Sequence, residues 1–205
     1  MDGEGQVVAR ARLVAMTRSL THRGPDDEGY YADTDVALGV RRLSIVDVAH
    51  GHQPVSNEAE DVWAVQNGEL YNQDLLRSGA LRAHRFRTRC DTEILPHAYE
   101  EFGVDLAARI DGEFSFAVWD GRSKRLVLAR DRAGVKPLYY AEVDGLLVFA
   151  SELKAILVSG LVDDELDREA VSAALTGRVL GQMLLAPETL PISGGEADSG
   201  RGVTS

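Results

Sequence analysis

Five polar segments in the first three quarters of the chain combine residue types that can bind or activate a small molecule. They are HRGPDDEGYY at 22–31, RRLSIVD at 41–47, NGELYN at 67–72, CDTE at 90–93 and ARDRAGVKPLYY at 129–140. Asn67-Gly68 can supply the N–H donors of an oxyanion hole, but this dipeptide is also typical of tight turns. Arg42 beside a strand is typical of a solvated charge, and Asp91 of a helix cap. Taken singly, each segment has a purely structural explanation.

The elements around these segments alternate between helix and strand. The spacing of apolar residues predicts a helix over Arg10–Leu20, which Gly24-Pro25 brings to a stop. Extended segments are predicted over Val36–Val46 and Val62–Gln66, where apolar and β-branched residues are frequent. A second helix is predicted over 91–102, capped by its first or second residue and facing inward with its apolar positions. Those positions are Ile94, Leu95, Ala98 and Phe102.

Two hairpins decide the fold class. FSFAVWDGRSKRLVLARDR reads as two alternating strands around Asp120-Gly121, and PLYYAEVDGLLVFASE as two more around Asp144-Gly145. Hairpins require antiparallel pairing, which a doubly wound parallel sheet does not provide. The sequence therefore predicts an α+β fold.

Composition excludes several classes of function. The 205 residues carry 33 acidic and 22 basic side chains, a formal charge of −11, so nucleic acid and membrane surfaces are poor candidate partners. No apolar run approaches the roughly 20 residues of a membrane span, and the first 30 residues do not resemble a signal peptide. The single cysteine, Cys90, excludes an internal disulfide and a zinc site built on several thiolates. We expect a cytoplasmic protein.

The chain divides into one compact domain over residues 1–160 and a weaker segment over 161–205. Asp167–Leu175 is compatible with one more helix, but Gly194–Ser205 has almost nothing to bury, and we expect most of this segment to be a disordered tail. Residues 193–199, SGGEADS, faintly resemble a pyrophosphate-binding loop with one residue too many. Too few residues follow to form the helix that such a loop needs, so ATP binding by this chain is not supported.

In this order the segments resemble one family. From about His22 to about Ile156, the chain is similar to the glutamine amidotransferase domain of asparagine synthetases, the class II or N-terminal-nucleophile type. The resemblance covers THRGPDDEGYY, the LGxRRLSIVD block, GHQP at 51–54, NGELYN, DTE, LARDRAGVKPLYY and FASELKAIL. It implies an αββα sandwich of two antiparallel sheets between helical layers. We interpret 161–205 as the remnant of a linker towards a synthetase domain.

The resemblance also implies a reaction and a binding site. The family hydrolyses glutamine and passes the ammonia to an ATP-using synthetase domain. The side-chain amide of Asn67 and the backbone N–H of Gly68 would form the oxyanion hole. Arg42 would bind the α-carboxylate of glutamine with its planar guanidinium, Asp91 would accept from the α-ammonium group, and Glu69 would add a second polar contact.

The beginning of the chain departs from the family. Family members begin with a cysteine that is the nucleophile, with its own α-amino group as the base, followed by an apolar strand. This chain opens with Met1-Asp2-Gly3, and we interpret the first strand and the catalytic cysteine as absent. We expect the chain in this form to be inactive. Without that strand, neighbouring strands would carry unpaired backbone groups, so we also expect low stability or self-association.

Other residues are not expected to replace the missing nucleophile. Cys90 has no α-amine beside it, and the adjacent Asp91 should raise the pKa of its thiol. His22 belongs to the HRGPD loop and His97 to a helical pattern. No pair of histidines has the spacing of metal ligands together with enough acidic residues nearby in the sequence, so we assign no metal. ATP and Mg²⁺ would belong to the missing synthetase domain, and we expect no cofactor in this chain.

Three functions remain open. The first is the glutamine-hydrolysing part of an asparagine synthetase-like enzyme, which supplies ammonia for amidation of aspartate or a related carboxylate, here truncated and inactive. The second is a non-catalytic module that binds glutamine or docks on a synthetase partner. The third is an amidotransferase that serves another acceptor, and nothing in the sequence separates it from the first. The expected partners are glutamine and a synthetase domain or subunit.

Overall fold

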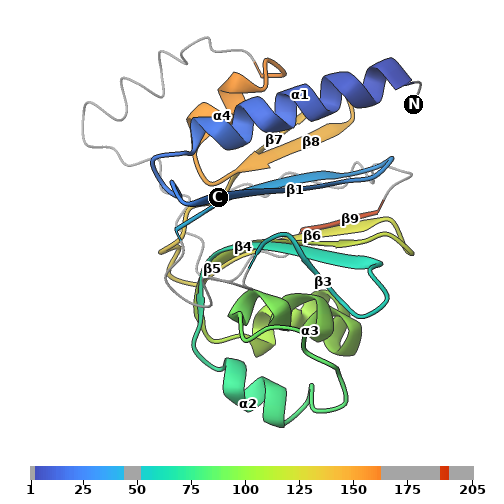
Figure 1. Ribbon diagram of the computed structural model, residues 1–205, viewed down its shortest axis with the longest axis vertical. Helices are drawn as coiled ribbons and strands as arrows, with labels where there is room; N and C mark the ends of the chain where they lie inside the picture. The colour runs from blue at the N-terminus through green and yellow to red at the C-terminus, as the bar shows by residue number, and fades with distance from the viewer. Residues whose placement is uncertain (1–2, 44–51, 163–189, 194–205) are drawn as a thin grey trace, which may run out of the picture.

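A computed structural model describes residues 3–43, 52–162 and 190–193. The elements stack in four layers, helix, sheet, sheet and helix (Figure 1). All strand pairs in the described residues are antiparallel. The expected α+β sandwich is therefore what the chain forms.

The upper half of Figure 1 holds the first helical layer and a sheet in two pieces. Strands β1 and β2 pair with each other, as do β7 and β8, and in the described residues no strand joins the two pairs. Helices α1 and α4 cover them. The bounds are α1 Gly3–Ser19, β1 Asp27–Ala32, β2 Ala37–Arg42, β7 Tyr139–Val143, β8 Leu146–Ala150 and α4 Leu153–Val158.

The lower half holds one five-stranded sheet in the order β3-β4-β5-β6-β9, with its helices beneath it. The strands β4, β5 and β6 follow one another along the chain and form its centre. The bounds are β3 Val55–Ser56, β4 Val62–Leu70, α2 Gln73–Ser78, the 3₁₀ turn η1 Asp91–Glu93, α3 Ile94–Phe102, the 3₁₀ segment η2 Gly103–Arg109, β5 Gly112–Asp120, β6 Arg125–Arg130 and β9 Leu190–Ser193.

Both predicted hairpins are confirmed. Asp144 and Gly145 form a two-residue turn with φ of 51° and 76°, and positive φ at both positions matches the twist of the flanking strands β7 and β8. The first hairpin has a longer connection, because β5 ends at Asp120 and β6 begins four residues after Gly121. The Asp120 carboxylate accepts hydrogen bonds from the Arg122 backbone N–H at 3.0 Å and the Ser123 hydroxyl at 2.8 Å, and these bonds order that connection.

Element boundaries differ from the sequence prediction in two helices. Helix α1 begins at Gly3 rather than Arg10, although glycine disfavours a helix interior. The helix packs on β2, where a Cβ at Gly39 would lie 2.2 Å from the Thr17 hydroxyl, so only glycine permits this approach. The segment predicted as one helix over 91–102 begins as the 3₁₀ turn η1 and continues as α3, whose inward residues Ile94, Leu95 and Ala98 are buried as expected.

The core consists of two clusters, one on each face of the five-stranded sheet. One lies between that sheet and α3, and the other between the two sheets. Two tryptophans lie between the sheets: the ring of Trp63 stacks on Tyr31 with centroids 4.3 Å apart, and the indole N–H of Trp119 donates to Asp33 at 2.7 Å. One aromatic contact and one hydrogen bond therefore tie β1 and its turn to β4 and β5.

The end of the chain is described only in part. Strand β9 pairs with β6, with Leu126 opposite Ile192, and closes that edge of the sheet. The predicted helix over Asp167–Leu175 and the predicted disorder over Gly194–Ser205 lie outside the described residues. In the part of the chain that the structure describes, no helix has the length and apolar character needed to cross a membrane.

Candidate functional site

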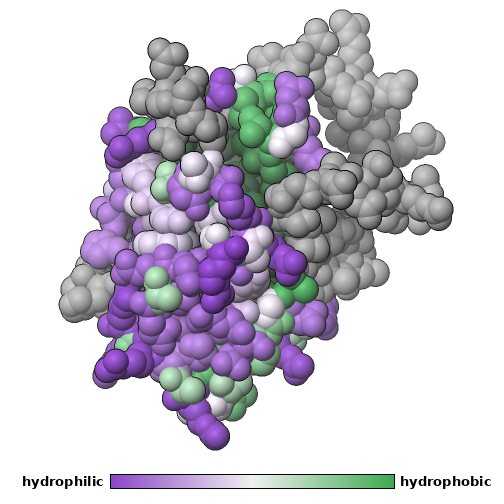
Figure 2. Space-filling model, turned by 90° about the vertical axis from the view of Figure 1, so that its right-hand side faces the viewer, coloured by the Kyte–Doolittle hydropathy of each residue, from purple (hydrophilic) through white to green (hydrophobic). Residues whose placement is uncertain are grey.

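A cavity of about 1390 Å³ extends from the space between the two sheets to helix α1. Its walls come from α1, β2, β4, β5, β8 and the 3₁₀ turn η1. The surface of the molecule is largely hydrophilic on the face of Figure 2, and hydrophobic residues gather in the upper part, at the level of α1 and the β7–β8 hairpin. The apolar residues of the cavity include Leu13, Met16, Val65, Ala117, Leu138, Leu147 and Phe149.

The predicted glutamine-binding residues meet at one cavity. Arg42 comes from the end of β2, Asn67, Gly68 and Glu69 from β4, and Asp91 from the first residue of η1, and all five line the cavity. They are contributed by three separate segments of the chain. The structure therefore places every residue that the sequence analysis assigned to the pocket on the wall of one cavity.

Asn67-Gly68 is not a turn. Both residues lie inside β4, paired with Ser115 and Phe114 of β5. Gly68 has φ of 135°, and a Cβ there would lie 2.0 Å from the carbonyl oxygen of Glu113, so this position requires glycine. The side-chain nitrogen of Asn67 is buried and has no hydrogen-bond partner among the described residues. An unused amide donor in a cavity wall is suited to bind an acceptor atom of a ligand.

Asp91 is not a helix cap. Neither the turn η1 nor α3 has a side-chain capping bond. Instead, Oδ2 of Asp91 accepts hydrogen bonds from Nε2 of Gln66 at 2.9 Å and from the backbone N–H of Leu70 at 2.8 Å. Two donors on β4 thus fix the carboxylate beside Asn67-Gly68, and among the described residues the other oxygen, Oδ1, has only the Cys90 thiol, at 3.7 Å.

Gln53 makes a second connection between β4 and η1. The sequence analysis did not identify this residue. Its Nε2 donates to the Thr92 hydroxyl at 3.0 Å, and its Oε1 accepts from the backbone N–H of Gln66 at 2.8 Å. It therefore bridges β4 and η1, the two elements that carry most of the pocket. The GHQP block was the available signal, but nothing in it indicates which strand the glutamine contacts.

Arg41 and Arg42 have different tasks because successive side chains of a strand point to opposite faces. Arg41 donates to the carbonyl of Gly24 at 2.7 Å and pairs with Glu28 at 2.9 Å, and only 9% of its side chain is exposed. A Cβ on Gly24 would lie 2.4 Å from the backbone nitrogen of Arg42, so this glycine lets the loop rest on the strand. Arg42 is half-buried at the cavity rather than solvated.

The ARDRAGVKPLYY block contains a structural turn. The Asp131 carboxylate accepts hydrogen bonds from the backbone N–H groups of Val135 at 2.9 Å and Lys136 at 3.0 Å. Burial raises the pKa of Asp131, but these hydrogen bonds outweigh it and leave the pKa below its usual value. The turn places Lys136 at the cavity, where its ammonium group pairs with Glu113 at 3.0 Å.

Cys90 lies at the cavity but is 5% exposed. Burial raises the pKa of its thiol, and this effect is larger than that of the neighbouring Asp91 charge, which the sequence analysis had made the main cause. Two contacts with Thr92 act in the opposite direction and do not reverse it. A thiol with a raised pKa is a poor nucleophile at neutral pH.

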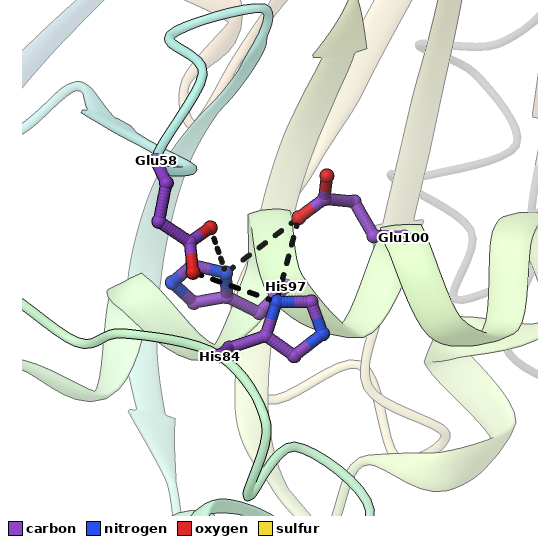
Figure 3. Close-up of side chains that lie close together, drawn as sticks. All are labelled: Glu58, His84, His97 and Glu100. Atoms are coloured by element: carbon purple, nitrogen blue, oxygen red, sulfur yellow. Dashed lines mark ion pairs between the residues drawn. The ribbon is translucent and has the colours of Figure 1, made fainter.

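The two histidines considered in the sequence lie apart from the cavity's polar residues. His22 is exposed and contacts Glu152 at 2.8 Å. His97 lies in α3, as its helical pattern predicted, and is fully buried there. It faces three residues that the sequence analysis did not connect with it, Glu58, His84 and Glu100 (Figure 3). Sequence spacing links only His97 and Glu100, one helical turn apart, and folding brings the other two to them.

Comparison with protein families identifies the chain. A family model described as a glutamine amidotransferase domain matches residues 3–188. The chain belongs to the glutamine amidotransferase family. Its relatives include glutamine-hydrolysing asparagine synthetase 2 of Bacillus subtilis, 43% identical over 144 residues, which covers 70% of this chain and 19% of that protein. Asparagine synthetase 2 of Arabidopsis thaliana is 43% identical over 148 residues, which covers 72% of this chain and 25% of that protein.

The amidotransferase domain thus corresponds to one part of longer proteins, because the chain spans about a fifth to three tenths of the length of the curated relatives it matches. Asparagine synthetase 3 of Bacillus subtilis, 39% identical over 176 residues, covers 84% of this chain and 29% of that protein. The family resemblance seen in the sequence is confirmed, and with it the amidotransferase class.

Solved structures confirm the fold. The glutamine phosphoribosylpyrophosphate amidotransferase of Bacillus subtilis, complexed with ADP and GMP, superposes with a TM-score of 0.58 at 20% identity, covering 71% of this chain and 40% of that one. An allosteric regulatory enzyme of purine biosynthesis gives a TM-score of 0.52 at 23% identity, covering 60% of this chain and 29% of that one. At these identities the likeness concerns the fold, which is the expected αββα sandwich.

Proposed function

We propose that the inter-sheet cavity binds glutamine and forms the glutamine site of an asparagine synthetase-like amidotransferase. The observation that carries the proposal is the meeting of a guanidinium, an unused amide donor and a fixed carboxylate, from Arg42, Asn67 and Asp91, at one cavity. Free glutamine carries a carboxylate, a carboxamide and an ammonium group, and each has a complementary partner in this set.

The roles follow from charge and direction of donation. Arg42 binds the α-carboxylate, and Oδ1 of Asp91 accepts from the α-ammonium group, with Glu69 as a second acceptor. The Asn67 amide and the Gly68 N–H point to the carboxamide oxygen, where negative charge develops during hydrolysis. The close approach of β5 at Gly68 makes this part of the wall rigid, which favours a preorganised oxyanion hole.

Hydrolysis needs a nucleophile in addition to this pocket. The described residues offer one thiol, that of Cys90, which is buried, has a raised pKa and has no amine base beside it. We therefore propose that residues 3–193 bind glutamine without turning it over, and that turnover requires an N-terminal cysteine of the kind the family uses.

In the whole enzyme, ammonia from this domain would be used for ATP-dependent amidation of aspartate or a related carboxylate, in the cytoplasm. We assign ATP and Mg²⁺ to the synthetase domain or subunit that would use the ammonia, and not to this chain. The relatives named above are called glutamine-hydrolysing asparagine synthetases, which supports this choice of acceptor over others.

A non-catalytic glutamine-binding or interaction module is the alternative. The buried thiol of Cys90 favours it, because a module that only binds glutamine in this pocket needs no reactive thiol. The two proposals share the binding site and differ in turnover. Self-association stays a prediction, which size-exclusion chromatography of the 205-residue chain tests.

Isothermal titration calorimetry with glutamine tests the pocket. Asp91→Asn retains an oxygen for Gln66 and Leu70 but removes the charge, so we expect glutamine affinity to fall roughly 10- to 100-fold, the value of a charge-assisted hydrogen bond. Arg42→Lys should also weaken binding, because an ammonium group cannot form the two-pronged contact. Asp74→Asn and Arg82→Lys, on exposed positions outside the cavity, are matched controls that should leave the affinity unchanged.

Ammonia release, measured with a coupled glutamate dehydrogenase assay, separates the alternatives. No release from a chain that binds glutamine supports binding without turnover by these residues. Release above background that survives Cys90→Ser would contradict our account of the missing nucleophile. Absence of glutamine binding, or equal binding by Asp91→Asn, would overturn the assignment of the pocket itself.

A further inference from the structure

A second cluster of side chains lies under the five-stranded sheet, on the opposite side from the glutamine cavity. It combines Glu58 from the loop after β3, His84 from the segment between α2 and η1, and His97 and Glu100 from α3 (Figure 3). The ligand atoms of these four residues all lie within 4.8 Å of one another. Two imidazoles and two carboxylates form a donor set that suits zinc.

His97 is the residue that points to a ligand. Its side chain is 1% exposed, and neither of its ring nitrogens has a hydrogen-bond partner among the described residues. Nδ1 faces Oε2 of Glu58 at 3.4 Å and Oε2 of Glu100 at 3.6 Å, separations longer than a hydrogen bond. Buried polar atoms are almost always satisfied, so an unsatisfied ring nitrogen aimed at two carboxylates calls for a partner between them.

The printed nitrogen–oxygen separations are compatible with a tetrahedral site. His84 Nδ1 lies 3.9 Å from Glu58 Oε1 and 3.7 Å from Glu100 Oε2. With metal–ligand bonds of 2.0–2.2 Å, the edges of a zinc tetrahedron are about 3.4 Å long. Three separations, of 3.4, 3.6 and 3.7 Å, join His84 Nδ1 and His97 Nδ1 to Oε2 of Glu58 or Glu100, and they lie at or slightly above this edge length. A small contraction of the side chains would complete the coordination.

Outer contacts orient three of the four residues. His84 Nε2 contacts a carboxylate oxygen of Glu101 at 3.0 Å, which leaves Nδ1 with its lone pair, the arrangement typical of zinc-binding histidines. Oε1 of Glu100 accepts from Nδ2 of Asn57 at 2.9 Å, which turns Oε2 towards the histidines. Oε1 of Glu58 accepts from the backbone N–H of Arg85 at 2.7 Å.

We propose that Glu58, His84, His97 and Glu100 bind one zinc ion. The charge balance agrees with this, since among the described residues the arginine or lysine within ion-pair distance of Glu100 is Arg122, at 3.9 Å, and it is half-exposed and also pairs with Asp61 and Asp120. The ion would tie the segment before Asp91 to α3 and the loop after β3, a structural role independent of the proposed glutamine site.

The test uses the tag-free 205-residue chain, freed of metal with a chelator and titrated with Zn²⁺ by calorimetry. We expect one ion per chain. X-ray absorption at the zinc edge should show a first shell of nitrogen and oxygen, with scattering from two imidazoles. This measurement is made on the unaltered chain and does not depend on whether a variant folds.

His84→Gln and Glu100→Gln each remove one ligand, and we expect at least a 100-fold loss of affinity, because even contacts outside the first shell change it 10- to 100-fold. His52→Gln is the matched control, since His52 forms an exposed pair with Asp27 at 2.6 Å outside the cluster. Circular dichroism checks that each variant is folded. Failure of the unaltered chain to take up stoichiometric zinc, or affinity within threefold of it in folded His84→Gln and Glu100→Gln, would overturn the proposal.

Discussion

The side-chain amide of Gln66 donates a 2.9 Å hydrogen bond to the carboxylate of Asp91 and so ties strand β4 of the lower sheet to the turn that precedes α3. Gln66 is 6% exposed and immediately precedes Asn67-Gly68 in β4. The two residues proposed to form the oxyanion hole and the carboxylate proposed to bind the ammonium group are therefore held at a fixed separation. We expect this bond to matter for affinity more than for folding.

Gln66→Met tests that expectation because it retains the length of the side chain and removes the donor. The Leu70 N–H still holds Asp91, so the fold should persist, while glutamine affinity should fall about tenfold, the value of one hydrogen bond to a charged group. Calorimetry and a thermal melt measure the two effects. A large drop in stability with unchanged affinity would instead mean that Gln66 serves only the sheet.

Gly68→Ala should destabilise the protein by more than its backbone conformation alone explains. The residue has φ of 135°, which typically costs about 1–3 kcal/mol for a residue with a side chain. The added methyl would also meet the Glu113 carbonyl at 2.0 Å. Urea unfolding gives the total loss of free energy.

Two controls separate these contributions. Gly103→Ala has positive φ, 58°, with nothing within 4 Å, and so reports backbone strain alone. Gly121→Ala has its nearest contact at 3.4 Å and should be close to neutral. If Gly68→Ala were no worse than Gly103→Ala, the close approach of β5 would not be the reason for glycine in this strand.

Cys90 should react slowly with iodoacetamide in the folded protein. Its thiol is buried and its pKa is raised by that burial, so the thiolate fraction at pH 7.5 is small. We expect labelling at least about tenfold slower than in urea, followed by mass spectrometry. The double variant Cys90→Ser/Ser78→Cys, with its thiol at an exposed position, should lose this protection; equal rates in the two folded proteins would contradict the prediction.

The Asp131 turn should contribute stability that acid removes. Its folded pKa lies below the usual 3.8, so the carboxylate stabilises the fold above about pH 4 and loses that contribution as the pH falls through the folded pKa. Asp131→Asn should cost about 1–3 kcal/mol at pH 7, because an amide has one acceptor oxygen for two N–H groups.

Urea unfolding at pH 7, 4 and 3 measures this difference between Asp131→Asn and the unaltered chain. The gap should shrink below pH 4 as the unaltered carboxylate is protonated. Asp74→Asn, at an exposed position, provides the baseline for removal of one acidic charge. A gap that stays constant from pH 7 to pH 3 would show that the Asp131 charge is not the source of the stability.

The local sequence was sufficient to predict both hairpins. Asp144-Gly145 forms a turn wherever two alternating segments flank it, so its effect does not depend on distant residues. The family motifs were sufficient to predict which residues line the pocket, since Arg42, Asn67 and Asp91 line the same cavity. In both cases the deciding signal lay within a few residues or in a known order of segments.

Contacts between residues that are distant in the sequence could not be predicted from local patterns or family motifs. Gln53 holds β4 and η1 together through two hydrogen bonds that no local pattern indicates. Asn67-Gly68 suggested a turn because its propensity favours one, yet pairing with β5 keeps it in a strand. His84 and Glu58 reach His97 only after the segments before α3 have packed beneath the sheet.

The two tryptophans give the molecule an internal optical probe. The chain has no others, and both lie between the sheets, Trp63 against Tyr31 and Trp119 hydrogen-bonded to Asp33. Their emission therefore reports the separation of the layers rather than the state of either layer alone. Tryptophan fluorescence of the unlabelled protein can therefore show whether a ligand bound in the cavity brings the two halves of the sandwich closer together.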